Sequence, residues 1–314
     1  AQYFLLFFVI KGKKYYPMTL KNDILTIEIA NQGAELTSLR KGQTEYLWQG
    51  NPAYWKRRAP VLFPIVGKVF NNQYRVNGEV YELPQHGFAR DKRFQTLYAT
   101  DTEAALQLTY SDDTLRIYPY KFQLTARYIL DGCRLRVKWL VENLGEGNLY
   151  YQIGGHPAFL LRDYDASDPV HGYEQLECLT EEDWEPLDAL RANKLTPQGY
   201  CLNQYSDIRL EDNLLPLTDD TFAHDAIVLE NSQAESVTLL DKAQRPYLRL
   251  TSIDATVMGL WSPHIPGCPF TCIEPWCGRA DREGFDGDIT RREHIQACLP
   301  SDKEEFGYEI EILD

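Results

Sequence analysis

The sequence predicts an all-β protein, built as a sandwich or a barrel. Many short segments alternate apolar and polar residues, and residues that favour turns, such as Gly, Pro and Asn, separate these segments. No segment shows a long period of 3.6 residues, which amphipathic helices require. The 20 Tyr, 13 Phe and 6 Trp, against only two Met, are also more typical of strands than of helical bundles.

The chain of 314 residues is long enough for one large or two ordinary domains, and no linker divides it. We therefore expect one β domain over residues 18–314. Residues 1–17 are interpreted as an extension of uncertain origin, because Met18 opens a segment that resembles a natural protein start. The apolar run from Tyr3 to Ile10 is too short to span a bilayer, and its basic cluster follows it rather than preceding it as in a signal peptide.

Charge and cysteine content limit the partners and the compartment. The net charge of −14 and the pI near 4.9 predict repulsion from nucleic acid and from anionic membranes. Seven Cys without a dense framework indicate reduced thiols and a cytoplasmic location. Cys268, Cys272 and Cys277 lie close together, but they lack the paired CxxC spacing of a zinc site. We expect no metal and no organic cofactor.

In the first half of the chain, alternation and turn residues predict the strands in order. Leu25, Ile27 and Ile29 alternate with polar residues, and Gly33 marks a turn or bulge before the strand continues. Residues 59–67 are bracketed by prolines and are expected to form an irregular buried segment. Further strands are expected at 44–49, 105–111, 120–130 and 134–145, and hairpins at Asn77-Gly78 within residues 73–83 and at Asp131-Gly132.

In the second half, the stretch from Arg162 to Leu215 is the least regular and is rich in acidic residues. Its run EEDWE, residues 181–185, is interpreted as a solvated loop or short helix rather than a metal site. Alternation then returns and predicts strands within residues 224–231, 236–241, 246–253 and 308–313.

One carboxylate follows a strand near the end of the chain. Residues 270–273 read as a strand that leads to Glu274 and then to Pro275 and Trp276. Because Pro275 cannot donate a hydrogen bond to a ladder, we expect the strand to end before it. Burial beside these two residues would raise the pKa of Glu274 and make it a base near neutral pH. The alternative is a structural Glu274 that is solvated or paired with Arg279.

Two histidines also lie where a strand meets Gly or Pro. His86 and Arg90 follow the hairpin in LPQHGFARD, and His156 lies between a Gly pair and Pro157 in YYQIGGHPAFLL. Rigid β scaffolds present reactive groups at such strand ends. Either His taken singly fits a structural role as well. The occurrence of two of only six His in such contexts favours function.

Together, the motifs HGFARD, GGHPAF and IEPW, in this order and at these separations, resemble the aldose 1-epimerase (galactose mutarotase) family, and in particular its LacX-type bacterial branch. The resemblance covers almost all of residues 18–314. It implies a large antiparallel β-sandwich with a carbohydrate cleft on one face. It also implies an isomerase that interconverts the α and β anomers of a hexose, with a small-molecule sugar as its partner and no cofactor.

The resemblance carries family roles to single residues. His156 resembles the general acid, and Glu274 resembles the general base. His86, Arg90 and Asp225 resemble residues that bind the sugar and steady the charge that develops on it.

This chain departs from the family's pattern at one place. It reads GKVFNN where the aldose-type branch has an asparagine–arginine pair, so Lys68 or Arg57 is expected to substitute. Trp276 is the expected platform for an apolar face of the sugar. Reference pKa values, near ~4.3 for Glu and ~6.5 for His, predict an ionised Glu274 and a His156 that needs a negative neighbour to stay protonated.

Two other functions remain open at this point. A hexose-6-phosphate mutarotase would use basic residues to hold the phosphate, and the candidates are Arg57, Arg58, Lys68, Arg90 and Lys92. A sugar-binding or sensing protein on the same fold would need no acid–base pair. The sequence leaves the oligomeric state open.

Overall fold

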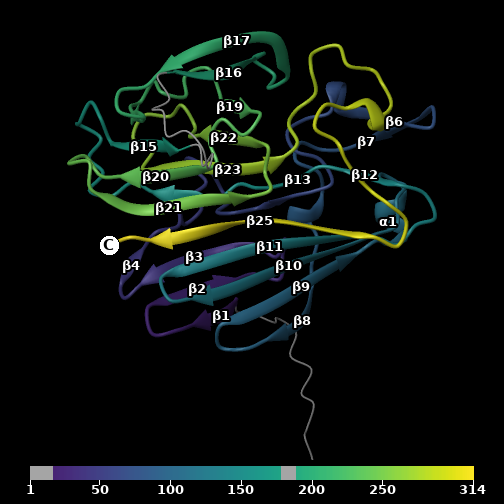
Figure 1. Ribbon diagram of the computed structural model, residues 1–314, viewed down its shortest axis with the longest axis horizontal. Coiled ribbons are helices and arrows are strands. Elements are labelled where there is room, and N and C mark those ends of the chain that lie inside the picture. The colour runs from purple at the N-terminus through teal and green to yellow at the C-terminus, as the bar shows by residue number, and fades with distance from the viewer. Residues whose placement is uncertain (1–16, 178–188) are drawn as a thin grey trace, which may run out of the picture.

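The computed structural model describes residues 17–177 and 189–314, and within these ranges the protein consists almost entirely of β-strands. The strands pair antiparallel in two large sheets, one smaller sheet and two ladders of two strands each (Figure 1). This arrangement confirms the all-β class and the large antiparallel β-sandwich. No helix within the described ranges is long and apolar enough to cross a membrane.

The largest sheet has nine strands and joins parts of the chain that are far apart in the sequence. Its strands, in spatial order, are β18 (Leu214–Leu217), β15 (Gly172–Glu177), β20 (Ser236–Leu240), β21 (Pro246–Ile253), β25 (Lys303–Ile312), β11 (Arg134–Asn143), β10 (Phe122–Asp131), β9 (Glu103–Thr109) and β8 (Gln95–Ala99).

The second large sheet has eight strands and carries the residues of the candidate site. Its order is β17 (Cys201–Arg209), β16 (Ala189–Leu195), β19 (Ile227–Glu230), β22 (Val257–Trp261), β23 (Phe270–Cys277), β13 (Ile153–Gly155) and β5 (Val61–Leu62), and β14 (Ala158–Leu160) pairs with β23 outside this path.

The remaining elements are short. A four-stranded sheet contains β1 (Met18–Lys21), β2 (Leu25–Ile29), β3 (Leu36–Lys41) and β4 (Thr44–Glu45). The two small ladders pair β6 (Gln73–Val76) with β7 (Glu79–Glu82) and β12 (Leu149–Tyr151) with β24 (Gln296–Cys298). The helical turns are α1 (Asp112–Leu115), η1 (Phe70–Asn72), η2 (Ala89–Asp91) and η3 (Ile289–Arg291).

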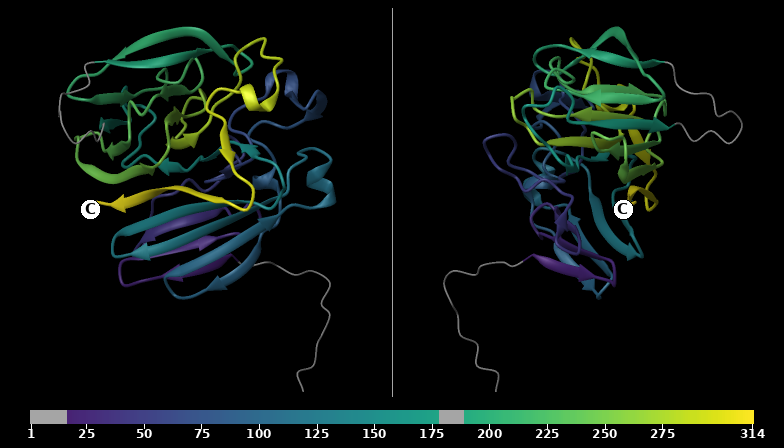
Figure 2. Two further views of the ribbon diagram at one scale, coloured as in Figure 1. Left: turned by 45° about the vertical axis from the view of Figure 1, so that its right-hand side comes forward. Right: turned by 90° about the vertical axis from the view of Figure 1, so that its left-hand side faces the viewer.

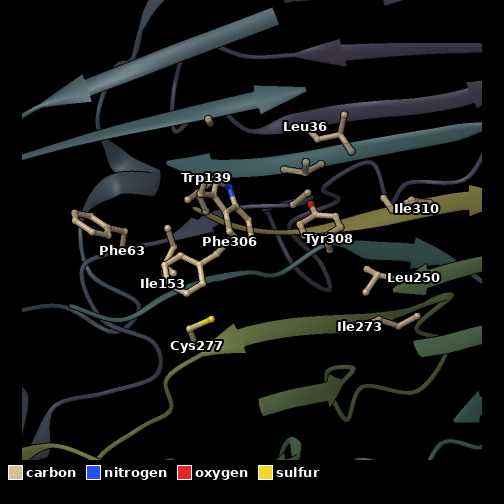
Figure 3. Close-up of a cluster of buried hydrophobic side chains, with 14 of the residues drawn as sticks. Leu36, Phe63, Trp139, Ile153, Leu250, Ile273, Cys277, Phe306, Tyr308 and Ile310 are labelled. Atoms are coloured by element: carbon tan, nitrogen blue, oxygen red, sulfur yellow. The ribbon is translucent and has the colours of Figure 1, made fainter. Parts of the chain in front are cut away.

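The main core lies between the two large sheets. Trp139 on β11 and Tyr308 on β25 reach from the nine-stranded sheet toward Ile273 and Cys277 on β23 (Figure 3). Since successive side chains of a strand point to opposite faces, Glu274 and Trp276 must face away from this core. The alternation along β23 therefore directs one carboxylate to the outer face of the eight-stranded sheet.

Strand β25 connects the early and the late portions of the chain. It pairs with β11 on one side and with β21 on the other. Strands β1 to β3, β8 and β9 lie on one side of β25, and β16, β17, β19 and β22 lie on the other (Figure 1), a separation that is also visible in Figure 2. This shared sheet supports our proposal that residues 18–314 form one domain.

The expectation that the strand ends before Pro275 is wrong, because β23 runs on to Cys277. Pro275 lies opposite Met258 of β22. On the other side of β23 the neighbouring strand is interrupted: β13 pairs with the end of β23, β14 pairs with its start, and His156 and Pro157 separate the two. Because no strand pairs with β23 at this position on that side, the missing N–H of Pro275 costs no ladder hydrogen bond there. A strand tolerates proline at such a position.

The middle of the chain is more regular than its composition predicts. The strands β15, β16, β17 and β18 all fall within residues 162–217. The exposed side chains of β17 are largely polar, so the alternation of apolar and polar residues gave a weak signal for this strand. The run at residues 181–185 lies outside the described residues. The predicted strand at 44–49 shrinks to β4, after which Leu47 forms an isolated bridge with Phe159.

Candidate active site

A cavity of about 350 Å³ lies on the outer face of the eight-stranded sheet. Strand β23, the break between β13 and β14, and the loops after β7 and β16 all contribute to its walls. The cavity brings together seven of the eight predicted site residues, namely Lys68, His86, Arg90, His156, Asp225, Glu274 and Trp276. Arg57 is the one that does not line it.

Glu274 reaches the cavity from the middle of β23. Its residue is only 1% exposed, and its Oε2 atom has no hydrogen-bond partner among the described residues. The structural alternative, a pair with Arg279, does not occur, because Arg279 binds Glu230 and Glu293 instead. A buried polar atom without a partner is costly, so an oxygen of this kind in a cavity wall is a candidate for contact with a ligand.

His156 lies beside Glu274 because the neighbouring strand breaks there. The glycine pair before it allows the backbone to pack closely: a Cβ on Gly154 would lie 2.5 Å from the Trp276 ring, and one on Gly155 would lie 2.8 Å from Tyr308. The Nε2 atom of His156 then comes within 3.1 Å of Glu274 Oε2. No hydrogen bond forms between these two atoms, and Glu274 Oε2 is left without a partner among the described residues.

Burial pushes both members of this pair toward their neutral forms. Desolvation lowers the pKa of His156 to about 3, and the positive charge of Arg90 acts in the same direction. Desolvation raises the pKa of Glu274 well above its usual value, and the Asp225 carboxylate adds to the increase. This direction agrees with the expectation that burial raises the pKa of Glu274, whereas the reference value near ~4.3 takes no account of desolvation. Since the groups interact, their titration belongs to the pair rather than to either residue.

His86 has a defined proton position. The N–H of Gly67 donates to His86 Nδ1 over 3.1 Å, while the backbone N–H of His86 donates to the Gly67 carbonyl over 2.7 Å. An Nδ1 atom that accepts a hydrogen bond leaves the ring proton on Nε2. Desolvation, with His156 and Arg90 nearby, lowers the pKa of His86 well below its usual value. The neutral ring thus carries its proton on Nε2, which lies 3.3 Å from the side-chain amide of Gln85 at the cavity wall.

Two cations line the cavity and a third stands behind them. Arg90 lies in the short turn η2, and its Nε is buried without a hydrogen bond, 3.9 Å from the nearest Asp91 oxygen. Burial, with Arg57 nearby, lowers the pKa of Arg90 to about 10. Lys68 donates to the Gln198 carbonyl over 2.6 Å. Arg57 instead binds Asp91, with 2.9 Å between Nη2 and Oδ1.

Asp225 and Trp276 both line the cavity, but they differ in exposure. Asp225 is exposed and has a left-handed backbone, with φ of 76°, which non-glycine residues rarely adopt. Trp276 is 5% exposed, its indole N–H donates to the Gly155 carbonyl over 3.2 Å, and its ring packs on Gly259. Trp276 is thus fixed in the wall, and its role as a sugar platform remains a proposal.

Sequence reasoning missed two other tryptophans of this cavity. Trp55 stacks on His156 with ring centroids 4.6 Å apart and 25° between the planes. Trp261 meets the same ring edge-on, at 5.6 Å and 85°. Both lie in segments without a recognised motif, and the high aromatic content was the only signal that pointed to them. Gln85, adjacent to His86 in its motif, also lines the cavity and was not singled out.

Cys268, Cys272 and Cys277 do not converge on one potential metal site within the described part of the chain. The thiol of Cys268 interacts with Ser262 and that of Cys277 with the Asp254 carbonyl. The potential metal donors that do converge within the described part of the chain belong to His156, Cys272 and Glu274, within 4.8 Å of one another. Burial raises the pKa of the Cys272 thiol well above its usual value, and this disfavours the thiolate that a metal would require. The expected absence of a metal cofactor stays a prediction.

Comparisons with known proteins agree with this arrangement. A sequence model described as aldose 1-epimerase matches residues 17–282. The chain is similar to two LacX proteins of Lactococcus lactis subsp. lactis, one chromosomal and one plasmid-borne, each 31% identical over 306 residues that cover 94% of this chain and 99% of the relative.

Solved structures give the same result. A galactose mutarotase related enzyme from Lactobacillus acidophilus has a TM-score of 0.86 at 29% identity, covering 95% of this chain and 97% of that one. A galactose mutarotase-like protein from Lactobacillus casei ATCC 334 also has a TM-score of 0.86, at 28% identity, covering 95% and 100%. The family match extends over most of the chain and includes the cavity residues, so the chain belongs to the aldose 1-epimerase family.

Proposed function

We propose that this protein is an aldose 1-epimerase that interconverts the α and β anomers of a free hexose. The observation that carries the proposal is the contact of His156 Nε2 with Glu274 Oε2, 3.1 Å apart in the wall of the cavity. The reaction exchanges protons at two oxygens that are attached to the same carbon, so an acid and a base that serve them must lie side by side.

The chemistry needs one proton on the pair. Glu274 removes the proton of the C1 hydroxyl as the bond between C1 and the ring oxygen breaks, and His156 gives a proton to that ring oxygen. The open-chain aldehyde then rotates, and the ring closes on the other face of C1 with both transfers reversed. Each positioned acid or base typically contributes ~10²–10⁴-fold to such a reaction. The starting state is the ionic form of the pair, which burial disfavours in the ligand-free cavity.

The other polar groups of the cavity suit a polyhydroxylated ligand. His86 presents an N–H donor, Arg90 and Lys68 are cationic donors, and Asp225 offers acceptors. A cavity with a few convergent polar groups and tryptophan side chains in its wall is typical of small-molecule sites. We assign these side chains to the sugar hydroxyls and to the charge that develops on the ring oxygen.

The test is the rate of anomer exchange, followed by polarimetry and by NMR exchange spectroscopy on glucose, galactose and other aldoses. We expect wild-type protein to accelerate exchange with at least one of them. Saturable sugar binding without acceleration would instead establish a binding protein on the same fold. Neither binding nor acceleration with any aldose would overturn the proposal.

A specific observation keeps hexose 6-phosphates as a second candidate substrate. Arg90 and Lys68 line the cavity, Arg57 lies near enough to act with them on His86, and Asp91 is the acid that pairs with Arg57 and Arg90. A phosphate group would form charge-assisted hydrogen bonds with such residues. This arrangement occurs in a protein whose net charge is −14, so the local sign differs from the overall one.

Rates on glucose and glucose 6-phosphate separate these substrates. For a phosphate-specific enzyme, kcat/KM should favour the phosphorylated sugar, the preference should weaken with salt, and Arg90→Ala should remove it. Arg116→Ala is the control, because Arg116 is exposed and pairs with Asp113 away from the cavity. An equal or higher kcat/KM on glucose would assign the enzyme to free sugars.

A further inference from the structure

The environment of His156 raises a problem that the acid–base pair alone does not solve. The proposed reaction needs a protonated imidazole, but His156 is only 7% exposed and lies near the positive charges of Arg90 and Arg57. The neutral His86 ring meets it edge-on at 5.6 Å. Among the groups that face His156, Glu274 is the one whose charge would favour an imidazolium, and burial disfavours that charge as well.

Trp55 presents its face to this imidazole. The two ring centroids are 4.6 Å apart, and the planes are 25° from parallel. Trp261 and His86 meet His156 at 85° and 79°, so Trp55 is the aromatic neighbour in the described part of the chain that stacks nearly parallel on the imidazole. The face of an indole carries negative potential and attracts a cation within ~6 Å of its centroid.

Trp55 is also held in this orientation by its own contacts. The indole N–H of Trp48 donates to the Trp55 carbonyl over 2.7 Å, and the Trp55 N–H donates to the Asn51 carbonyl over 3.0 Å. Its ring lies against Trp261 and Phe270, with centroids 5.8 and 6.2 Å away. A ring fixed before the substrate arrives does not need to be ordered during the reaction.

We propose that Trp55 is a positioning residue for His156 whose stacked π face selectively stabilises the imidazolium form that donates the proton. The inference rests on the proposed function, since it assigns a role within that reaction. Because the attraction is present only when His156 is charged, Trp55 should affect kcat more than substrate binding. A cation–π contact in a desolvated site is strong enough to change a rate by about 5- to 30-fold.

The first experiment is a graded series at position 55 with Phe and Leu. If the π face matters, kcat should fall in the order Trp, Phe, Leu, with Leu about 5- to 30-fold below wild type and KM changed little. Phe keeps a weaker π face and so gives partial rescue, whereas Leu fills space without one. Equal kcat for the Phe and Leu variants, or a loss confined to KM, would overturn the inference.

The second experiment changes the electrostatics of the indole with minimal change in shape. Wild-type protein is produced with mono-, di- and trifluorinated tryptophan, each of which weakens the negative potential of the ring face. We expect log kcat to decrease steadily with fluorination. Trp55→Phe protein with the same analogues is the control, because it carries the other five tryptophans of the six in the chain. No trend in wild type, or the same trend in both proteins, would refute the role of Trp55.

The outcomes separate this inference from the function on which it rests. Wild-type protein that fails to accelerate anomer exchange contradicts the proposed function, and the role of Trp55 with it. Wild-type protein that is active but insensitive to fluorination leaves the epimerase intact and removes only the role of Trp55.

Discussion

At the scale of single residues, the contact between His156 and Glu274 predicts that the effects of substituting them on kcat are not additive. Glu274→Gln keeps the shape but removes the base, and His156→Asn removes the acid, so each should lower kcat by ~10²–10⁴-fold while sugar still binds. The double variant should lose far less than the product of the two losses. Steady-state exchange kinetics of the four proteins measure this. Near wild-type kcat for Glu274→Gln would disprove the base assignment and make Asp225 the next candidate.

The same pair predicts an unusual pH profile. The lowered pKa of His156, about 3, makes a second proton hard to add, and the raised pKa of Glu274 makes the single proton hard to remove. The pair therefore holds one proton over a wider range than free Glu and His would. We expect kcat/KM to stay level from pH 5 to about 7, with its acid limb below the usual Glu value of ~4.3. An acid limb at about pH 4.3 together with an alkaline limb at about pH 6.5 would show that the reference pKa values of Glu and His apply instead.

Asp225 allows the alkaline limb to be moved deliberately. Its negative charge contributes to the raised pKa of Glu274, so Asp225→Asn should lower that pKa and shift the alkaline limb to lower pH. Asp220→Asn is a matched control, because Asp220 lies in the same loop but contacts His264 and does not line the cavity. Full pH profiles of the three proteins test the shift. An alkaline limb at the same pH in all of them would mean that another group controls it.

Short motifs predicted most of the site residues, but not the charges that these residues carry. His86, His156 and Glu274 were found because each stands beside Gly or Pro in a recognisable motif. The raised pKa of Glu274 was expected from its neighbours Pro275 and Trp276. The lowered pKa values of the two His were not, since they depend on burial by residues that are distant in the sequence. Trp55 was missed for a similar reason: its contact with His156 spans 101 positions and leaves no local pattern.

At the scale of elements, the pairing of β22 with β23 holds the cavity wall in place. A Cβ on Gly259 of β22 would lie 2.6 Å from the ring of Trp276, which neighbours Glu274 on the same face. Gly259→Ala should therefore displace Trp276, destabilise the protein by about 1–3 kcal/mol and lower kcat. Urea unfolding and exchange kinetics measure both effects. Gly147→Ala, where a Cβ meets nothing within 4 Å, is the control, and equal behaviour of the two variants would contradict this packing.

Elements with clear local signals were also the ones that the sequence predicted well. The hairpins at Asn77-Gly78 and Asp131-Gly132 form as expected, with β6 pairing β7 and β10 pairing β11. The sequence predicted too short a β23, because the rule that proline ends a strand considers one strand alone. Whether a strand tolerates proline depends on its neighbours, and here the neighbouring strand is interrupted. The strands β15 to β18 were missed because their alternation is weak, and long-range pairing compensates for it.

At the scale of the whole molecule, a buried carboxyl links the two large sheets. Thr271 of β23 donates from Oγ1 to Glu174 Oε1 of β15 over 2.8 Å, and Glu174 is fully buried. Burial raises the pKa of Glu174 to about 8. Between the usual value near ~4.3 and 8, the folded protein holds a proton that the unfolded chain releases, so stability falls as pH rises through this range.

Glu174→Gln tests this link, because the amide cannot ionise and its contribution to stability does not depend on pH. The melting temperature of the variant relative to wild type should therefore increase from pH 5 to pH 8, corresponding to at most about 1.4 kcal/mol for each pH unit. Thermal unfolding at several pH values measures the difference. A difference that stays constant with pH would mean that Glu174 is already ionised in the folded protein.

The position of β25 has a consequence for how the protein is made. The strand lies between β11 and β21, so the nine-stranded sheet lacks its central connection until residues 303–312 have left the ribosome. Until then, the nascent chain exposes two unpaired strand edges, and such edges are templates for pairing with other chains. Synthesis that stalls shortly before residue 303 would release a chain with both edges open. A chain that stops before residue 303 should therefore be prone to aggregation, even though the other described strands are complete.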